Sequence, residues 1–430
     1  MAVLPFLPII VMFGLFALRI PVAFALIIAA IVYFSFINTT MPIEIMVQTL
    51  VSSTESFPYL AIPFFTCAGV VFNDSGISER LMTLANLIVG HVRGGMAQVN
   101  VLLSAMMGGL SGSANADAAM QTKMLVPEMT RLGYDKGFST VVTAASSCIT
   151  PIIPPGIILI LYALLADVSV ARMFFAGYLP GLILCAALMV TVSVVSRRRG
   201  YRPARDRRAS AREIGRQVLD SSWALFLPFG LLLGLRFGIF TPTEAGAICV
   251  LYAVLVGAFV YKQLKWTQLP AILLESAEAT AGVMFIICAA QAFGSYLTWE
   301  GIPLAVSAAL TEHISSPWVM LLVINLVLLF IGFFFEGGAA MVLMAPLFVP
   351  VAKALGIDLV HFGILMSINL TIAGFTPPIG TMMFITLSIA RVRMEDYVRE
   401  AWPFLLVLIA VLLLITFVPG IVLFLPNLFM

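Results

Sequence analysis

The chain has 430 residues, of which 61% are hydrophobic and only 10% are charged, and its mean hydropathy is +1.09. Soluble globular domains carry about a quarter charged residues, so this composition excludes them and is typical of a protein that lies in a lipid bilayer. The formal net charge of +2 is too small to indicate a nucleic-acid partner.

The N-terminus, MAVLPFLPII, lacks the basic residues and the cleavage site of a signal peptide, so we interpret it as a retained first span. A helix needs about 20 apolar residues to cross the hydrocarbon, and the apolar segments predict an all-α polytopic membrane protein. The candidate crossings are Leu4–Leu18, Pro21–Phe36, Tyr59–Val71, Phe138–Leu165, Phe174–Val195, Trp223–Leu235, Glu244–Tyr261, Ser276–Leu297, Phe362–Ile389 and Phe404–Leu425.

Two further apolar stretches, 96–131 and 318–352, are interrupted near their middles by small or polar residues. Lys and Arg in short loops stay on the cytoplasmic side, so the arginine-rich segment 196–217 is expected to be a solvated cytoplasmic loop. By this rule Arg19, Arg93 and Arg131 also lie inside, and both ends of 96–131 face the cytoplasm. The first stretch is therefore predicted to be a re-entrant hairpin, and the second, by the same rule, a hairpin that enters from the outer side.

The tip of the first hairpin reads GGLSGSANADAAM, from Gly108 to Met120. Non-helical backbone inside a membrane is tolerated only where it is buried in protein or lines a polar cavity. Close helix packing through Gly108 and Gly112 is the simpler interpretation, but it leaves the cluster of polar side chains unexplained. That cluster, which predicts a binding site, comprises Ser111, Ser113, Asn115 and Asp117. For Asp117, both a helix cap and a place in the site fit the sequence.

Each hairpin is followed by a long apolar run with two adjacent prolines and a glycine, ITPIIPPGIILI from Ile149 and FTPPIGTMMFI from Phe375. Such a pair is expected to unwind each helix near the membrane midplane. Short amphipathic arms precede the hairpins, at 75–95 and 299–316. The order repeats, so we expect two inverted repeats, 1–195 and 218–430, joined by the loop 196–217. Paired interruptions in inverted halves indicate the midplane site of a secondary transporter.

Unwound carbonyls and hydroxyls are ligands that suit a dehydrated sodium ion, whereas half-helix N-termini suit a carboxylate. One expected sodium site combines the first hairpin tip with the first break. A second expected site combines the second hairpin tip with the second break. Their residues are Ser111, Ser113, Asn115, Thr150 and Pro151, and then Gly337, Gly338, Thr376 and Pro377. Glu336 lies at the second tip. Burying an unpaired carboxylate in a membrane costs free energy, so this residue is a candidate functional acid.

The sequence lacks the motifs of several enzyme classes. The sequence has no GxxxxGK[ST] phosphate loop, no HExxH and no G-x-S-x-G, and its three histidines are isolated. The five cysteines lie in apolar segments without metal-like spacing, which indicates buried side chains rather than ligands or disulfides. We therefore expect neither an enzyme nor an organic cofactor.

The segments GGLSGSANADAAM, TPIIPPG, FFFEGGAAM…MAPLFVP and FTPPIG, with RIPVAFAL after the first span, together resemble the large membrane subunit of tripartite ATP-independent periplasmic (TRAP) transporters. The resemblance covers essentially the whole chain. It implies an elevator fold of the ion-transporter superfamily, and sodium-coupled uptake of sialic acid, a dicarboxylate or a similar organic acid across a bacterial inner membrane. It also implies at least two sodium sites, and both termini are expected on the periplasmic side.

The resemblance further implies a small four-helix membrane subunit, expected as a separate chain, and a periplasmic substrate-binding protein. The implied sodium-binding residues are Ser111, Ser113, Thr150, Pro151 and Gly156, together with Gly337, Gly338, Thr376, Pro377 and Gly380. The implied substrate-binding residues are Ser113, Asn115 and Glu336, with Asp117 as a further candidate. The arms and early spans would form a static scaffold, and the hairpins and broken helices would move.

Two alternatives stay open at this point. A stand-alone sodium/dicarboxylate-type symporter would share the architecture, although such proteins typically carry Ser-Asn-Thr at the hairpin tips, where this chain has SGS and EGG. A membrane subunit that only anchors an enzyme complex would need no paired broken helices and no polar tips at the midplane.

Overall fold

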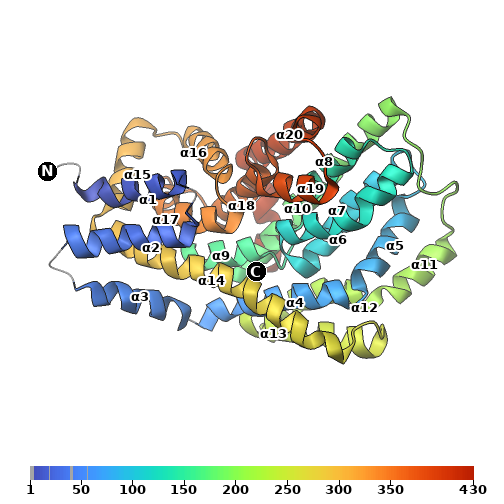
Figure 1. The fold of residues 1–430 in the computed structure, drawn as a ribbon, viewed down its shortest axis with the longest axis horizontal. Coiled ribbons are helices and arrows are strands. Elements are labelled where there is room, and N and C mark those ends of the chain that lie inside the picture. The colour runs from blue at the N-terminus through green and yellow to red at the C-terminus, as the bar shows by residue number, and fades with distance from the viewer. Residues whose placement is uncertain (1–3, 19, 39–41, 56) are drawn as a thin grey trace.

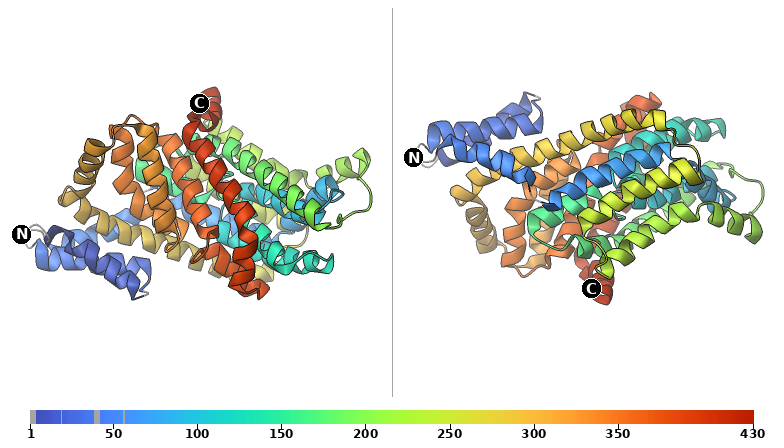
Figure 2. Two further views of the ribbon diagram at one scale, coloured as in Figure 1. Left: turned by 90° about the horizontal axis from the view of Figure 1, so that it is seen from above. Right: turned by 90° about the horizontal axis from the view of Figure 1, so that it is seen from below.

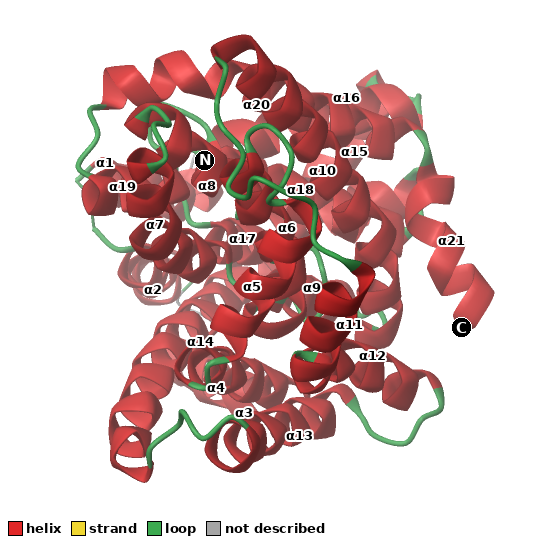
Figure 3. Ribbon diagram, turned by 90° about the vertical axis from the view of Figure 1, so that its right-hand side faces the viewer, coloured by secondary structure: helices red, strands yellow, loops and turns green. Residues whose placement is uncertain are grey.

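The computed structural model describes residues 4–18, 20–38, 42–55 and 57–430, so Arg19 of the orientation argument lies outside the described residues. The described residues form helices joined by short turns, with no strand among them (Figure 3). This confirms the all-α prediction. Hydrocarbon offers the backbone no hydrogen-bond partners, and helices satisfy their own peptide groups within each segment.

The first half of the chain ends with the longest helix of that half, α10. Its helices are α1 (Leu7–Ala17), α2 (Val22–Val32), α3 (Ile43–Glu55), α4 (Ala61–Asp74), α5 (Ile77–Val89), α6 (Gly95–Ser111), α7 (Ala114–Arg131), α8 (Lys136–Ser146), α9 (Ile157–Ala166) and α10 (Val170–Arg199). Short 3₁₀ or π segments occupy Leu4–Phe6, Tyr33–Ile37 and Phe57–Leu60. The expected tip falls between α6 and α7, and the expected break falls between α8 and α9.

The second half repeats this order after the connecting helix α11 (Ala211–Asp220). Its helices are α12 (Ser222–Arg236), α13 (Pro242–Leu255), α14 (Leu269–Trp299), α15 (Ile302–His313), α16 (Pro317–Gly332), α17 (Gly337–Ala354), α18 (Leu359–Phe375), α19 (Thr381–Ala390), α20 (Met394–Phe417) and α21 (Pro419–Phe429). Further short segments lie at Val256–Val260 and Trp266–Gln268. Each break contains a cis peptide bond between its two prolines, Pro154–Pro155 and Pro377–Pro378.

Two segments differ from the sequence-based expectation. Helix α3 was not expected, because its apolar residues are interspersed with polar ones, and it packs one side against α14. The segment 196–217 is not a loop throughout, since α10 continues to Arg199 and α11 begins at Ala211. Ser210 and Glu213 form a capping box that starts α11, which leaves only 200–209 as the connecting loop.

Five helices are long and apolar enough to cross a membrane, or seven if each of two bent pairs counts as one span, among the residues that the structure describes. Most of the other expected crossings appear as apolar helices of 10–17 residues. For two of the expected crossings the reason is that a break divides what the sequence shows as a single apolar run. Phe138–Leu165 becomes α8 and α9, and Phe362–Ile389 becomes α18 and α19.

The two halves make matching contacts with one another. Helix α4 packs on α13 as α2 packs on α14, and α7 packs on α19 as α9 packs on α17. Each hairpin thus lays its second limb against the second part of the other half's broken helix. This exchange brings the two tips together. The division into two inverted repeats stays a prediction.

Two layers follow from these contacts. Helices α1–α4 and α12–α14 form one layer, which we call the scaffold layer; α3, α4, α13 and α14 run along the bottom of Figure 1. Helices α6–α10 and α16–α20 form the second layer, which we call the block. The two further views show α20 and the adjoining helices of the block on the side away from α13 (Figure 2). The arms, α5 and α15, each pack on a hairpin.

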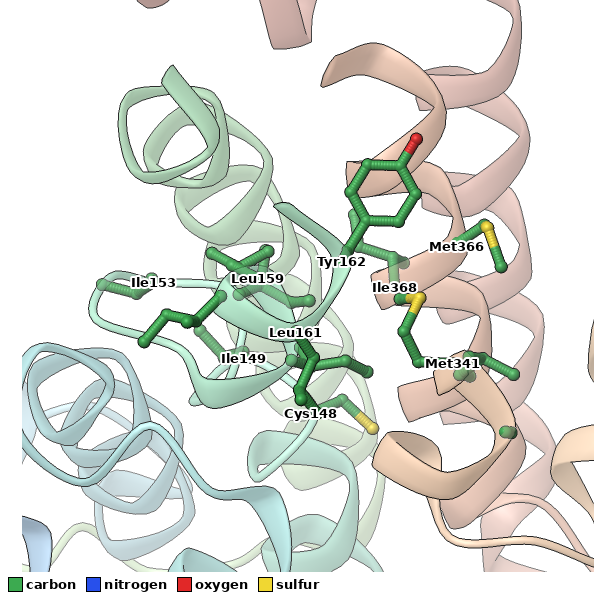
Figure 4. Packing of buried hydrophobic residues seen from close by; sticks show 14 of the residues in the cluster. Cys148, Ile149, Ile153, Leu159, Leu161, Tyr162, Met341, Met366 and Ile368 are labelled. Carbon is green, nitrogen blue, oxygen red and sulfur yellow. The ribbon is translucent and has the colours of Figure 1, made fainter. Parts of the chain in front are cut away.

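The first break is buried in protein, as unwound backbone in a membrane requires. Ile149, Ile153 and Leu159 surround it, and Tyr162 points toward the helices of the second half (Figure 4). A side chain at Gly108 of α6 would place its Cβ only 2.7 Å from the Cβ of Ile153. Glycine at this position therefore allows the first hairpin to lie directly against the break.

Candidate functional site

One cavity lies between both hairpin tips, the first break, the parts of α18 and α19 that flank the second break, and helix α14 of the scaffold layer. Its volume is about 120 Å³, enough for several water molecules or a small organic group. The polar side chains that line it are those of Ser113, Asn115, Glu336, Thr371 and Thr381. Glycines of the second tip and apolar side chains of α9, α14 and α17 complete the wall.

Four helices begin at this cavity. Ala114 and Asn115 open α7, Ile157 and Ile158 open α9, Gly337 and Gly338 open α17, and Thr381 and Met382 open α19, and all of these residues line the cavity. A helix N-terminus presents free N–H groups and a partial positive charge of roughly half a unit. The cavity is therefore electropositive in its backbone before any side chain is considered.

Side chains cap two of these four helices and leave the other two uncapped. Ser113 caps α7 by accepting a hydrogen bond from the Ala116 N–H at 3.4 Å. Glu336 caps α17 by accepting from the N–H groups of Gly338 and Ala339 at 2.9 and 3.3 Å. At α9 and α19 the N-cap residues are Gly156 and Gly380, which have no side chain to accept such bonds. These two N-termini are thus the ones open to an anionic ligand.

The first tip is held against the first break by backbone contacts. Gly112 turns the chain with a φ of +59°, and its carbonyl accepts a hydrogen bond from the Ile157 N–H at 3.3 Å. A Cβ at Gly112 would lie 2.3 Å from the carbonyl oxygen of Pro155, so only glycine fits both the conformation and the contact. The start of α9 is thereby fixed beside the tip.

Asp117 lies outside the cavity, in a buried network of hydrogen bonds. Its side chain is 1% exposed, and its carboxylate accepts from Ser104 Oγ at 2.8 Å, Thr150 Oγ1 at 2.9 Å and Gln121 Nε2 at 2.7 Å. The network joins both limbs of the first hairpin to the first break. Asp117 is not the cap of α7, because Ser113 holds that position, and its carboxylate does not face the cavity.

Glu336 is the only ionisable side chain among the described residues that line the cavity. Its side chain is exposed, and one carboxylate oxygen, Oε2, makes both capping contacts. The other oxygen is left for a ligand. The second tip around it is anchored to α1, where the ring of Phe335 packs edge-on against Phe16 with centroids 4.6 Å apart.

The remaining predicted residues divide between the cavity and the two breaks. Ser113, Asn115, Pro151, Gly337 and Gly338 line the cavity. Thr376, Pro377 and Gly380 lie in the second break, where the Gly380 N–H donates to the Thr376 carbonyl at 3.2 Å, and none of the three lines the cavity. The structure thus brings the two tips together with the first break more closely than with the second.

The donor set around the first tip fits a hard cation. The hydroxyl of Ser111 is buried and has no hydrogen-bond partner, an arrangement that calls for a bound water or ion. Hydroxyl and carbonyl oxygens are what such a cation requires. Among the described residues no group of three or more His, Cys, Asp or Glu side chains could hold a metal ion. Softer transition metals therefore lack their preferred ligands.

Several residues of the site were not anticipated from the sequence. Thr371 and Thr381 line the cavity, and Thr381 donates to Asn115 Oδ1 at 3.4 Å, which joins the two halves. Val283, Ile286 and Ile287 of α14 form one wall, and nothing in a uniform apolar helix marks them out. The contact of Gln121 with Asp117 could have been predicted, because Gln121 follows Asp117 by four residues and so lies on the same helix face.

Comparison with known proteins gives one consistent family. Residues 9–421 match the family described as tripartite ATP-independent periplasmic transporter, DctM component. The chain is 38% identical over 378 residues to the C4-dicarboxylate TRAP transporter large permease protein DctM of Pseudomonas aeruginosa, covering 88% of each chain. It is 36% identical over 417 residues to the sialic acid TRAP transporter large permease protein SiaM of Vibrio cholerae, covering 97% of each.

A solved structure shares the fold at low sequence identity. The YdaH transporter of Alcanivorax borkumensis superposes with a TM-score of 0.66 at 15% identity, covering 88% of each chain. At that identity the likeness extends to the fold alone. It shows that the overall fold of this chain also occurs in a solved structure.

Asp117→Ala should destabilise the protein, because three buried donors would lose their shared acceptor. We expect a loss of about 2–4 kcal/mol in the free energy of unfolding, and about 1 kcal/mol for Asp117→Asn, where the hydroxyls of Ser104 and Thr150 can rotate to accept. Thermal unfolding of the purified chain measures both, with the exposed Asp206→Ala as a control expected to be neutral. A stable Asp117→Ala protein would contradict the structural role.

Glu336 permits its charge and its cap to be separated. Glu336→Gln keeps an acceptor for the Gly338 N–H and should unfold within a few tenths of a kcal/mol of the unchanged protein, whereas Glu336→Ala should lose about 0.5–2 kcal/mol. Both variants should lower substrate uptake in proteoliposomes, because both remove the carboxylate from the cavity. Normal uptake by the glutamine variant would restrict Glu336 to capping.

Proposed function

The chain belongs to the DctM family of TRAP transporter large permeases, and from this premise we propose that it imports an organic acid by sodium-coupled, elevator-type alternating access. Family membership and the apolar helices make it a multi-pass membrane protein that transports rather than catalyses. The sodium coupling, the moving block, the inner-membrane location and the individual sites are the proposal.

The observation that carries the proposal is the convergence of four helix N-termini on one central cavity, two of them uncapped. The starts of α9 and α19 both lack a capping side chain and suit a carboxylate, although the Ile157 N–H of α9 already donates to the Gly112 carbonyl. Ser113, Asn115, Thr371 and Thr381 offer hydrogen bonds to its remaining polar groups. A dicarboxylate, a sialic acid or a similar acid is the expected substrate class, as the names of the two relatives indicate for those proteins.

Sodium would bind beside this site. The unpartnered Ser111 hydroxyl, with Ser113 and the carbonyls of Thr150 and Pro151, would form the site at the first tip. Gly337 and Gly338 would contribute to the second, with Thr376 and Pro377. A cation next to Glu336 would compensate the only carboxylate at the cavity and favour entry of an anionic substrate.

Elevator movement fits the two layers. The scaffold layer contributes one wall of the cavity. This wall consists of the apolar side chains of Val283, Ile286 and Ile287 on α14. An apolar wall allows the block to slide without breaking hydrogen bonds. We propose that the block moves with its cargo, and that α1–α4 and α12–α14 remain fixed with the small four-helix subunit.

The same proposal assigns the orientation and the partners. The arginine-rich segment between α10 and α11 would face the cytoplasm, and both termini would lie on the periplasmic side. A periplasmic binding protein would deliver the substrate to the outer surface. Apolar side chains are exposed on the scaffold layer, Phe24 on α2 and Phe229 on α12 among them, which suits lipid or the small subunit.

Uptake should require both sodium and the binding protein. The chain and its small subunit, reconstituted in proteoliposomes, would be tested with radiolabelled sialic acid and dicarboxylates under an inward sodium gradient. Accumulation should fall to background when either the gradient or the binding protein is omitted. Uptake with sodium but without a binding protein would indicate a stand-alone symporter, and no uptake by a folded complex would support an anchor subunit.

Cross-linking the block to the scaffold layer should stop transport. Cysteine pairs between α14 and α17, which pack against each other, would be placed at positions that do not line the cavity and oxidised in a Cys288→Ala background. We expect uptake to be lost on oxidation and restored on reduction, while assembly with the small subunit is unchanged. Undiminished uptake by a fully cross-linked protein would rule out the elevator movement.

A further inference from the structure

A second cavity lies far along the chain from either hairpin tip, where α8 and α20 begin and α10 ends. Its volume is about 640 Å³. The residues that line it are Asp135, Lys136, Gly137, Arg199, Arg391, Val392, Arg393, Asp396, Arg399 and Glu400. Five of them are cations and three are carboxylates, so the lining carries an excess of positive charge.

All three carboxylates are already engaged with arginines. Arg199 pairs with both Asp135, at 3.2 Å, and Glu400, at 2.7 Å, and Arg393 pairs with Asp396 at 3.1 Å. Asp135 also accepts a hydrogen bond of 2.6 Å from the Tyr201 hydroxyl. Burial and the neighbouring Asp135 raise the pKa of Tyr201, which keeps this hydroxyl protonated as the donor.

The other three cations have no such partner. Lys136, Arg391 and Arg399 are exposed and make no ion pair with any described residue. They come from three different places, namely the start of α8, the end of α19 and the first turns of α20. These three cations share one cavity with carboxylates that are already paired with Arg199 and Arg393, so the lining keeps an excess of two positive charges.

The backbone does not require a cation at this place. Arg391 ends α19 in the left-handed conformation, with a φ of +50°. Asp167 ends α9 at the corresponding place of the first half, with a φ of +54°. The same turn therefore carries opposite charges at the two ends of the block. The positive charge of Arg391 is a property of this cavity rather than of the turn.

The cavity adjoins the expected membrane surface. Trp402 follows Arg399 by three residues on α20, is 59% exposed, and begins the apolar part of that helix. Exposed tryptophans are typical of the interface between hydrocarbon and headgroups. A tryptophan at the interface would put Arg399, which lines the cavity, near the level of the lipid phosphates.

We propose that Lys136, Arg391 and Arg399 bind the phosphate of an anionic phospholipid headgroup in this cavity. Arginine and lysine are the usual phosphate ligands, and basic pockets at the cytoplasmic ends of membrane helices bind anionic headgroups. Because α8, α10, α19 and α20 all belong to the block, the lipid would be carried by the block rather than by the scaffold layer. The inference uses the membrane placement of the proposed function but not its transport activity.

The general preference for basic residues on the cytoplasmic side offers a simpler explanation of these cations. It predicts no preference for position, so neutralising any three exposed arginines in the region should have the same effect. Arg198, Arg208 and Arg212 provide that comparison, since they are exposed, make no ion pair among the described residues and do not line the cavity.

The test measures lipid binding by the full-length chain in detergent. Phosphatidylglycerol or phosphatidylcholine would be titrated in, with the unfolding temperature and native mass spectrometry as readouts. The variant Lys136→Gln/Arg391→Gln/Arg399→Gln should bind phosphatidylglycerol on the order of a hundredfold more weakly, at about one kcal/mol for each cation. The variant Arg198→Gln/Arg208→Gln/Arg212→Gln should bind within about threefold of the unchanged chain, as expected for exposed charges away from the contact.

Further measurements distinguish a lipid headgroup from a soluble anion and a loss of binding from a loss of folding. Inorganic phosphate at constant ionic strength should not displace the lipid; if it binds and competes, the phosphate site holds but its source is a soluble anion. Arg391→Lys/Arg399→Lys, which keeps the charges, should retain most of the binding and so shows that the glutamine variant is not merely unfolded. Equal losses in both triple variants, or no preference for phosphatidylglycerol, would overturn the proposal, whereas a failure of sodium-driven uptake would not affect it.

Discussion

The structure depends on the cost of unwound backbone inside a membrane. Two helices are broken and two hairpins are turned at central positions, and each freed peptide group must be buried in protein or face a polar cavity. Glycines make this possible by removing side chains at the contacts, as at Gly108 against Ile153 and at Gly112 against Pro155. Hydrogen bonds complete the arrangement, with Asp117 joining both limbs of the first hairpin to Thr150 of the break. The cavity lies between the two hairpin tips and the helices that begin at the breaks.

The interruptions themselves could be predicted because they are written in local residue types. Adjacent prolines followed by a glycine cannot continue a helix, so the breaks at 150–156 and 376–380 follow from the sequence. The direction of a side chain is different, since it depends on what packs around the helix. Asp117 sits in the first turn of α7, where a cap and a place in the site were both compatible with its position. Only tertiary packing turns it toward Ser104 and Gln121, and only packing selects Val283 and Ile287 from the many apolar residues of α14.

The two halves share their architecture but distribute their acids differently. Both second limbs contain Ala-Ala-Met shortly after the tip, at 118–120 and 339–341. Counted from this common element, Asn115 corresponds to Glu336, and Asp117 corresponds to Gly338. The first half therefore places its acid within the hairpin, where it contributes to rigidity, and presents a neutral amide to the cavity. The second half presents its acid to the cavity and leaves its hairpin interior without one, so the two tips are suited to unlike ligands.

This asymmetry gives a physical reason for coupling an organic acid to a cation. The four helix N-termini at the cavity contribute roughly half a positive charge each, and Glu336 offsets about half of their sum. A substrate with two carboxylates would then leave the cavity negative. Moving uncompensated charge through the low-dielectric interior of a membrane is costly, so a block that carried such an anion alone would meet a high barrier. A cation beside Ser111 or Glu336 would lower that barrier, because it offsets the negative charge that the anion adds.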